Sequence, residues 1–355
     1  MKTNPLYPIA SPWLICDEQD RAIADLVRFC DGQHTIAQVG KAIRGQGRCV
    51  EEFMRLGERL GVVALATEDM PFLNAWYANE FGALLFEGAK IHGTSPSAYL
   101  SVIKRHYREL SEYLKRSPEE VHLLYQRSFG QEAPGNVPCE GTAPQSETLI
   151  KAIYQRYDFE AYVVRRHLIH FYWLTAGLLF SRAVRQVREK CRTASSVRVL
   201  DAGCGNGALV RRVLQSVRKG CRVVGTDIGW SVLKFAKFVD RKRGTTHSNL
   251  LRSDIEKLPF HRGAFDIICC FEVMEHVPAP ESALREFHRV LKPHGALMLS
   301  WSGGANLSSG HVSAAGSEEI RERLRANEFS VKYLEEIPAV QTTFVEAKRS
   351  SRNRG

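Results

Sequence analysis

The stretch Ser196–Leu214 reads SVRVLDAGCGNGALVRRVL and decides the fold of the second half of the chain. Val197, Val199 and Leu200 form a short apolar run that predicts a strand, and the apolar residues after Gly207 recur at helical spacing. The alternate glycines between these two elements allow backbone conformations closed to other residues and a close approach of a ligand. The following helix points its N-terminal N–H groups at that ligand. We therefore predict a strand, a glycine turn and a helix that together face a bound molecule.

The next predicted strand carries an acid at its end. Cys221–Gly225 (CRVVG) is a second apolar run, and Asp227 follows it, 26 residues beyond Asp201. In nucleotide-binding folds a carboxylate at such a place pairs with ribose hydroxyls. The spacing D-x-G-x-G-x-G differs from the dinucleotide pattern and requires no pyrophosphate site. With these two motifs the chain resembles the class I S-adenosylmethionine-dependent methyltransferases.

The resemblance extends over Ser195–Lys348 and rests on further matches in the same order along the chain. Asp254 follows a third short strand, and the family usually has a glycine in place of His294. The remaining matches are the predicted fourth strand Phe265–Phe271, the turn Leu291–Gly295 and the fifth strand Ala296–Ser300. A helix over Ser317–Ala326 and two closing strands, Phe329–Ile337 and Thr342–Ala347, complete the seven strands of the family. The predicted fold class is thus α/β, with a Rossmann-like seven-stranded methyltransferase domain.

The resemblance implies S-adenosylmethionine as the cofactor and assigns residues to it. Asp201 organises the methionine end, Asp227 binds the ribose and Asp254 binds the adenine. The residues that line the rest of the pocket are Gly203, Gly205, Gly207, Ile228, Ile255 and Phe271. The alternative is a nucleotide-like fold that binds no ligand. A fold that binds no ligand, however, would not require three acidic residues at these positions.

The predicted loop after the fourth strand contains EVMEHVP, with Glu272, Glu275 and His276. Ligands of open α/β folds bind at this carboxyl edge of the sheet. The simplest interpretation is that the acids order the loop. The pattern E-x-x-E-H also resembles the ubiquinone-type O-methyltransferases, which implies that these three residues hold a divalent cation such as Mg²⁺. A third interpretation makes His276, beside Glu275, a general base.

The first half of the chain shows a different pattern of predicted elements. Residues 1–68 show an apolar run at Trp13–Cys16, three amphipathic helices and a strand, which is a winged-helix outline. Within it Phe29–Ile43 (FCDGQHTIAQVGKAI) resembles the turn of PqqD-like peptide-binding domains, which implies docking of a peptide or protein partner. Ile36–Ile43 carries Lys41 as its one basic residue, which argues against a DNA-recognition helix.

We therefore divide the chain into a winged-helix-like domain (1–68), a helical connector and linker (69–146), a methyltransferase domain with an N-terminal cap helix (147–348) and a tail (349–355). Within the connector and cap, apolar periodicity predicts helices over the ranges 73–90, 98–115, 118–127 and 147–190. The cap helix carries His167 and His170, for which polar packing is the simpler interpretation than metal binding. Three tyrosines of this segment, Tyr154, Tyr157 and Tyr162, are candidates to face a substrate, although packing is the simpler role for each. The glycine- and serine-rich stretch Ser302–Gly316 suits a lid.

The composition of the chain limits the classes of protein to which it can belong. The chain has 355 residues, 44% hydrophobic and 25% charged, as in ordinary globular proteins. It opens without the apolar run of a signal peptide and lacks a long apolar segment, so no transmembrane segment is predicted. Nine scattered cysteines without a C-x-x-C pair favour a reducing cytoplasm. The net charge of +10 is spread over many segments, so a solvated surface is favoured over nucleic-acid binding.

These observations lead to one function and one alternative. The leading hypothesis is an S-adenosylmethionine-dependent methyltransferase that acts on a biosynthetic small molecule or peptide. Oxygen is the favoured acceptor atom through the E-x-x-E-H resemblance, and the N-terminal domain docks a peptide or partner. The alternative is a DNA- or protein-binding regulator whose methyltransferase domain senses the cofactor without turnover.

Overall fold

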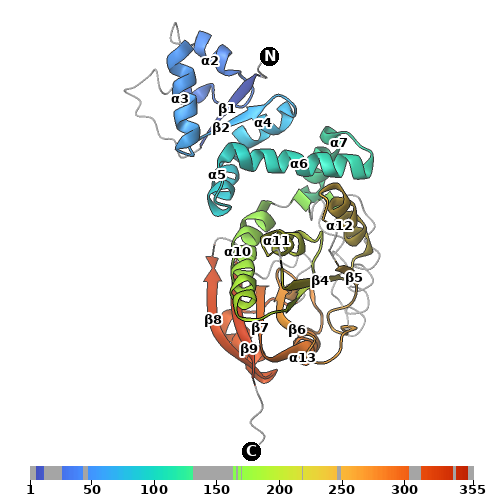
Figure 1. Cartoon of the computed structure of the whole chain (residues 1–355). Helices are drawn as coiled ribbons and strands as arrows, with labels where there is room; N and C mark the ends of the chain where they lie inside the picture. The colour runs from blue at the N-terminus through green and yellow to red at the C-terminus, as the bar shows by residue number, and fades with distance from the viewer. Residues whose placement is uncertain are drawn as a thin grey trace, which may run out of the picture. The chain divides into compact units, whose positions relative to one another are not determined.

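The computed structural model (Figure 1) describes residues 5–11, 26–42, 47–130, 163–164, 167–168, 170–217, 219–245, 249–303, 313–338 and 341–350. The chain packs into two compact units. The first comprises residues 1–123 and 168–178, and the second comprises residues 124–167 and 179–355. The apolar run Trp13–Cys16, the tyrosines Tyr154, Tyr157 and Tyr162, and most of the predicted lid lie outside the described residues.

The first unit begins with a two-stranded antiparallel sheet of β1 (Leu6–Ala10) and β2 (Val63–Thr67). Between these strands lie α2 (Ile36–Ala42) and α3 (Gly47–Arg59). Thr35 caps α2, because its Oγ1 accepts from the Gln38 N–H while the Gln38 side chain accepts from the Thr35 N–H. A small core lies between sheet and helices, formed by Leu26, Cys30, Val39, Val50, Met54, Val63 and Leu65. Strand β1 was not predicted, and the winged-helix and PqqD-like interpretation stays a prediction.

Four helices follow β2: α4 (Pro71–Asn79), α5 (Gly82–Ile91), α6 (Pro96–Leu114) and α7 (Pro118–Gly130). The predicted single helix over residues 73–90 is wrong, because the chain breaks between α4 and α5. The N–H groups of Glu80 and Phe81 both donate to the Trp76 carbonyl, which closes α4. A capping box begins α7: the Ser117 N–H donates to the Glu120 carboxylate, and the Glu120 N–H donates to Ser117 Oγ.

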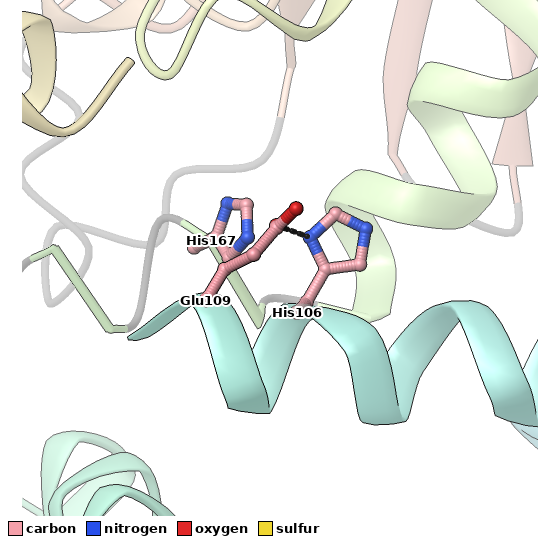
Figure 2. A group of neighbouring side chains, drawn as sticks. All are labelled: His106, Glu109 and His167. Carbon is pink, nitrogen blue, oxygen red and sulfur yellow. Dashed lines mark ion pairs between the residues drawn. The ribbon is translucent and has the colours of Figure 1, made fainter. Parts of the chain in front are cut away.

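Helix α6 joins the predicted first domain to the helices that follow it. The buried Lys104 ammonium donates to the Thr67 carbonyl at 2.9 Å and lies 3.1 Å from a carboxylate oxygen of Asp69. Burial lowers the pKa of Lys104 to about 8. Two residues further along α6, His106 Nδ1 lies 3.5 Å from Glu109 Oε2, and both side chains are buried (Figure 2). The division at residue 68 stays a prediction.

The second unit is built on a seven-stranded sheet in the order β5-β4-β3-β6-β7-β9-β8 (Figure 1). The five strands from β5 to β7 pair in parallel, and β9 pairs antiparallel with both β7 and β8. The strands are β3 (Val197–Ala202), β4 (Cys221–Asp227), β5 (Asn249–Arg252), β6 (Phe265–Cys270), β7 (Leu291–Ser302), β8 (Phe329–Ile337) and β9 (Thr342–Arg349). This sheet confirms the predicted Rossmann-like methyltransferase fold.

Helices connect the parallel strands: α10 (His170–Thr193) precedes β3, α11 (Ala208–Ser216) leads to β4, α12 (Trp230–Lys242) to β5 and α13 (Pro280–Val290) to β7. A short 3₁₀ turn, η1 (Met274–His276), follows β6, and α14 (Ser317–Ala326) precedes β8. The central strands are buried on both faces, so they read as continuous apolar runs. That is why the sequence located them.

The predicted turn at Leu291–Gly295 is the opening of β7. His294, which stands where the family usually has glycine, takes a φ of +59°. This left-handed conformation is the one that glycine adopts without steric cost. The histidine is therefore tolerated in a backbone geometry that the usual glycine explains.

Among the described residues, no helix combines the length and the apolar character that a membrane crossing requires. The cysteines whose side chains are described carry free thiols, namely Cys30, Cys191, Cys204, Cys221, Cys269 and Cys270.

Candidate functional site

The glycine turn lies at the carboxyl edge of the sheet, where β3 ends between β4 and β6. The N–H groups of Gly203 and Cys204 both donate to the Thr226 carbonyl at 2.8 Å, which fixes the start of the turn against β4. The three predicted glycines, Gly203, Gly205 and Gly207, all have positive φ, as the alternate spacing requires. The turn is therefore held to the sheet at one end and shaped by glycine along its length.

The glycines differ in what surrounds them. A Cβ added to Gly203 would lie 2.3 Å from the Val273 side chain, so this glycine allows close packing against the loop after β6. A Cβ added to Gly205 would meet nothing within 4 Å. Gly205 thus presents bare backbone to open space, as a site for close approach of a ligand requires.

Asp227 ties this turn to the next loop. Its Oδ2 accepts from the Gly205 N–H at 2.8 Å, and its Oδ1 accepts from the Gly229 N–H at 2.8 Å. The sequence predicted the carboxylate but not these two contacts. One side chain therefore sets the spacing between the glycine turn and the start of α12.

Asp201 is buried at the end of β3, with 4% of its surface exposed. Its Oδ2 meets no hydrogen-bond donor among the residues that the structure describes. Burial, and secondarily the nearby charge of Asp227, raises the pKa of Asp201 to about 8. A buried carboxyl with an unsatisfied oxygen is suited to a cationic group of a ligand.

The other predicted cofactor residues lie at the same edge of the sheet. Asp254 follows β5, and its Oδ1 accepts from the Glu256 N–H at 2.9 Å. Ile255 and Phe271 are buried, and Ile228 is half-buried just beyond β4. The topology therefore brings residues from three loops to one edge, as the resemblance implied.

The loop after β6 is strained and held by a serine. Glu272 has a φ of +55°, which is unusual for a residue with a side chain. The buried Ser300 Oγ accepts from the Glu272 N–H at 2.8 Å and donates to Glu272 Oε1 at 2.7 Å. The Thr342 hydroxyl lies 3.4 Å from the same oxygen. Sequence reasoning missed Ser300, which lies inside an apolar strand and carries no motif.

The predicted cation ligands do not converge. Glu275 is 1% exposed, and its Oε1 lies 4.0 Å from His276 Nε2. Among the described residues, Glu272, Glu275 and His276 do not form a group whose three ligand atoms all lie within 4.8 Å of one another. Glu272 Oε1 instead bonds Ser300. The arrangement of these three residues does not fit the implied divalent cation, so we assign no role to a cation.

The comparisons with known proteins agree with this geometry. A family model described as "Methyltransferase domain" matches residues 193–345. Residues 193–345 form a class I S-adenosylmethionine-dependent methyltransferase domain. The cofactor of such a domain is S-adenosylmethionine. The open glycine turn and the buried Asp201 carboxyl fit that cofactor, which carries a cationic methionine end.

Curated relatives of the methyltransferase domain include ubiquinone biosynthesis O-methyltransferases. The protein from Escherichia coli O9:H4 (strain HS) is 31% identical over 134 residues, which are 38% of this chain and 54% of that protein. The protein from Escherichia fergusonii is 32% identical over 114 residues, 32% of this chain and 46% of that protein. The chain thus spans about half the length of these relatives. A solved S-adenosylmethionine-dependent methyltransferase from Aquifex aeolicus is 20% identical, with a TM-score of 0.40, covering 47% of this chain and 89% of that one.

Proposed function

We propose that the whole chain is an S-adenosylmethionine-dependent methyltransferase that methylates an oxygen atom of a biosynthetic small molecule. One observation carries the cofactor part of the proposal: the Asp227 carboxylate bridges Gly205 and Gly229, beside a turn whose Gly205 faces open space. In nucleotide-binding folds a carboxylate at the end of this strand pairs with ribose hydroxyls, and these two backbone contacts hold Asp227 beside the glycine turn. The proposal assigns the ribose to Asp227, the adenine to Asp254 and the methionine end to Asp201.

The bound cofactor supplies a methyl group already activated on a sulfonium, so the chain must chiefly place the acceptor in line with it. Transfer to a hydroxyl breaks the bond between methyl and sulfur, forms a bond between methyl and oxygen, and releases the hydroxyl proton. We assign that proton to His276 Nε2. Glu275 Oε1 lies 4.0 Å from this nitrogen.

Oxygen as the acceptor atom is supported by the similarity to proteins named ubiquinone biosynthesis O-methyltransferases. The E-x-x-E-H pattern at Glu272–His276 supports the same choice. Docking of a peptide or protein partner by residues 1–68 stays a prediction.

The test of the cofactor site is calorimetric titration of S-adenosylmethionine and S-adenosylhomocysteine into the full chain. We expect micromolar binding by the natural sequence and loss of binding in Asp227→Ala, since both backbone contacts and the ribose acceptor disappear. Asp227→Asn keeps one acceptor oxygen and should retain weak binding. Glu318→Gln, at a side chain 72% exposed on α14, is the matched control and should bind normally.

Absence of binding by the natural sequence would refute the proposal. If binding is found, the acceptor is sought by incubating phenolic metabolites and peptides with the cofactor, and mass spectrometry then counts the methyl groups gained. Methylation of a nitrogen or carbon atom in preference to oxygen would contradict the proposed acceptor.

A further inference from the structure

The glycine turn has a second anchor, which comes from the chain before the sheet. The Asn206 Nδ2 group lies 2.8 Å from His167 Nδ1. Both side chains are buried, His167 to 1% and Asn206 to 8% exposure. The contact joins residues 39 positions apart in the sequence, and Asn206 stands inside the turn between Gly205 and Gly207.

The direction of this hydrogen bond follows from the other end of the Asn206 amide. Asn206 Oδ1 accepts from the Ala208 N–H at 3.1 Å, at the first residue of α11. The carbonyl oxygen therefore faces the helix, and the amide NH₂ donates to His167 Nδ1. His167 acts as an acceptor here, which requires the neutral imidazole with its proton on Nε2.

His167 is itself held in place by α12. Its ring packs edge-on against the buried Phe235 ring, with centroids 4.7 Å apart and an angle of 82° between the planes. Phe235 belongs to the helix that starts just after the Asp227 loop. Packing against Phe235 therefore helps to fix the ring orientation in which Nδ1 accepts the hydrogen bond from Asn206.

We propose that His167 is a positioning residue that holds the cofactor turn in its binding conformation through Asn206. This inference rests on the proposed function. Three residues of the turn, Gly203, Gly205 and Gly207, are glycines, and glycine loses more conformational freedom on ordering than any other residue. Asn206 lies between the last two glycines, and its side chain connects the turn to His167. If the turn is already ordered in the ligand-free protein, less of the binding free energy is lost on ordering the turn. The cofactor then binds more tightly.

The test uses variants at both ends of the bond in the full chain. His167→Phe removes the acceptor but keeps an aromatic ring against Phe235, and Asn206→Ala removes the donor. His167→Gln retains an acceptor oxygen. His261→Asn, an exposed histidine whose Nδ1 contacts the Arg262 carbonyl, is the matched control. Circular dichroism and thermal melts establish that each variant is folded.

Two measurements are made. Hydrogen exchange of residues 203–208 in the ligand-free protein reports the order of the turn, and calorimetry gives the Kd of S-adenosylhomocysteine. We expect His167→Phe and Asn206→Ala each to speed exchange and to raise the Kd about tenfold, the effect of one lost buried hydrogen bond. The double variant should be no worse than the poorer single one, because both act through the same bond.

His167→Gln should restore the Kd to within about threefold of the natural value, since its amide oxygen accepts as the imidazole did. At saturating cofactor we expect an unchanged kcat, with the effect confined to the KM for the cofactor, because His167 touches none of the reacting atoms in the proposed reaction. Additive effects in the double variant, or normal exchange and normal Kd in both single variants, would overturn the inference. If the natural sequence fails to bind S-adenosylhomocysteine, the proposed function fails, while the exchange measurement still decides whether His167 orders the turn.

Discussion

The buried Asp201 makes a quantitative prediction about cofactor binding and pH. Burial raises the pKa of this carboxyl from 3.8 to about 8, so at neutral pH the ligand-free protein carries it mostly as the acid. The cofactor brings a cationic methionine end to the same edge of the sheet. A neighbouring cation favours the carboxylate, so binding should lower the pKa of Asp201 and release its proton.

The magnitude follows from linkage. While the free carboxyl is protonated and the bound one is ionised, the affinity rises about tenfold for each pH unit. Between pH 6.0 and 7.5 the Kd should therefore fall about 25-fold, and at pH 7 about 0.9 proton should be released for each ligand bound. The range stops at 7.5 because an α-amino group, such as that of the cofactor, loses its own proton at about 8.

The assay is isothermal calorimetry with S-adenosylhomocysteine and S-adenosylmethionine in pairs of buffers that differ in ionisation enthalpy. Asp201→Asn is the control, because the amide has the same shape but does not ionise. The Kd of Asp201→Asn should be high and should not change with pH over this range. An equally steep pH dependence in Asp201→Asn, or a flat one in the natural sequence, would refute the assignment of the methionine end to Asp201.

The same shift predicts a stability effect, and three other predictions follow from the site. Because the folded protein holds the Asp201 proton up to about pH 8, its stability should fall as pH rises from about 4 to 8, and Asp201→Asn should have the higher melting temperature at pH 8.5. Gly205→Ala should abolish cofactor binding at a stability cost of about 1 kcal/mol, whereas Gly203→Ala, with its clash against Val273, should cost more than that in urea denaturation. Equal stability costs for the two glycine variants would contradict the packing argument. His294→Gly should raise the free energy of unfolding by about 0.5 to 1 kcal/mol without changing cofactor affinity, since it relieves a φ of +59° at an exposed position. His276→Asn should lower kcat about a hundredfold or more with an unchanged KM for the cofactor, and a change in that KM alone would remove His276 from the proposed proton transfer.

The amino-acid sequence by itself determined the elements of the methyltransferase domain and the acids at their ends. Strands such as Val197–Ala202 and Phe265–Cys270 are buried on both faces, so their apolar runs are visible without any knowledge of their neighbours. The glycines of the turn and the caps at Thr35 and Ser117 are likewise local, because the chain there meets its own backbone within a few residues.

Tertiary structure alone decided which of these groups meet. The bonds from Asp227 to Gly205, from His167 to Asn206 and from Ser300 to Glu272 each join distant positions, and no local period encodes such a pair. The pairing of β1 with β2 likewise joins distant positions. The same holds for Asp201, whose type and place were predicted while its raised pKa was not. The sequence gives the identity of an ionisable group, but burial and neighbouring charges set its pKa. Both of these exist only in the folded protein.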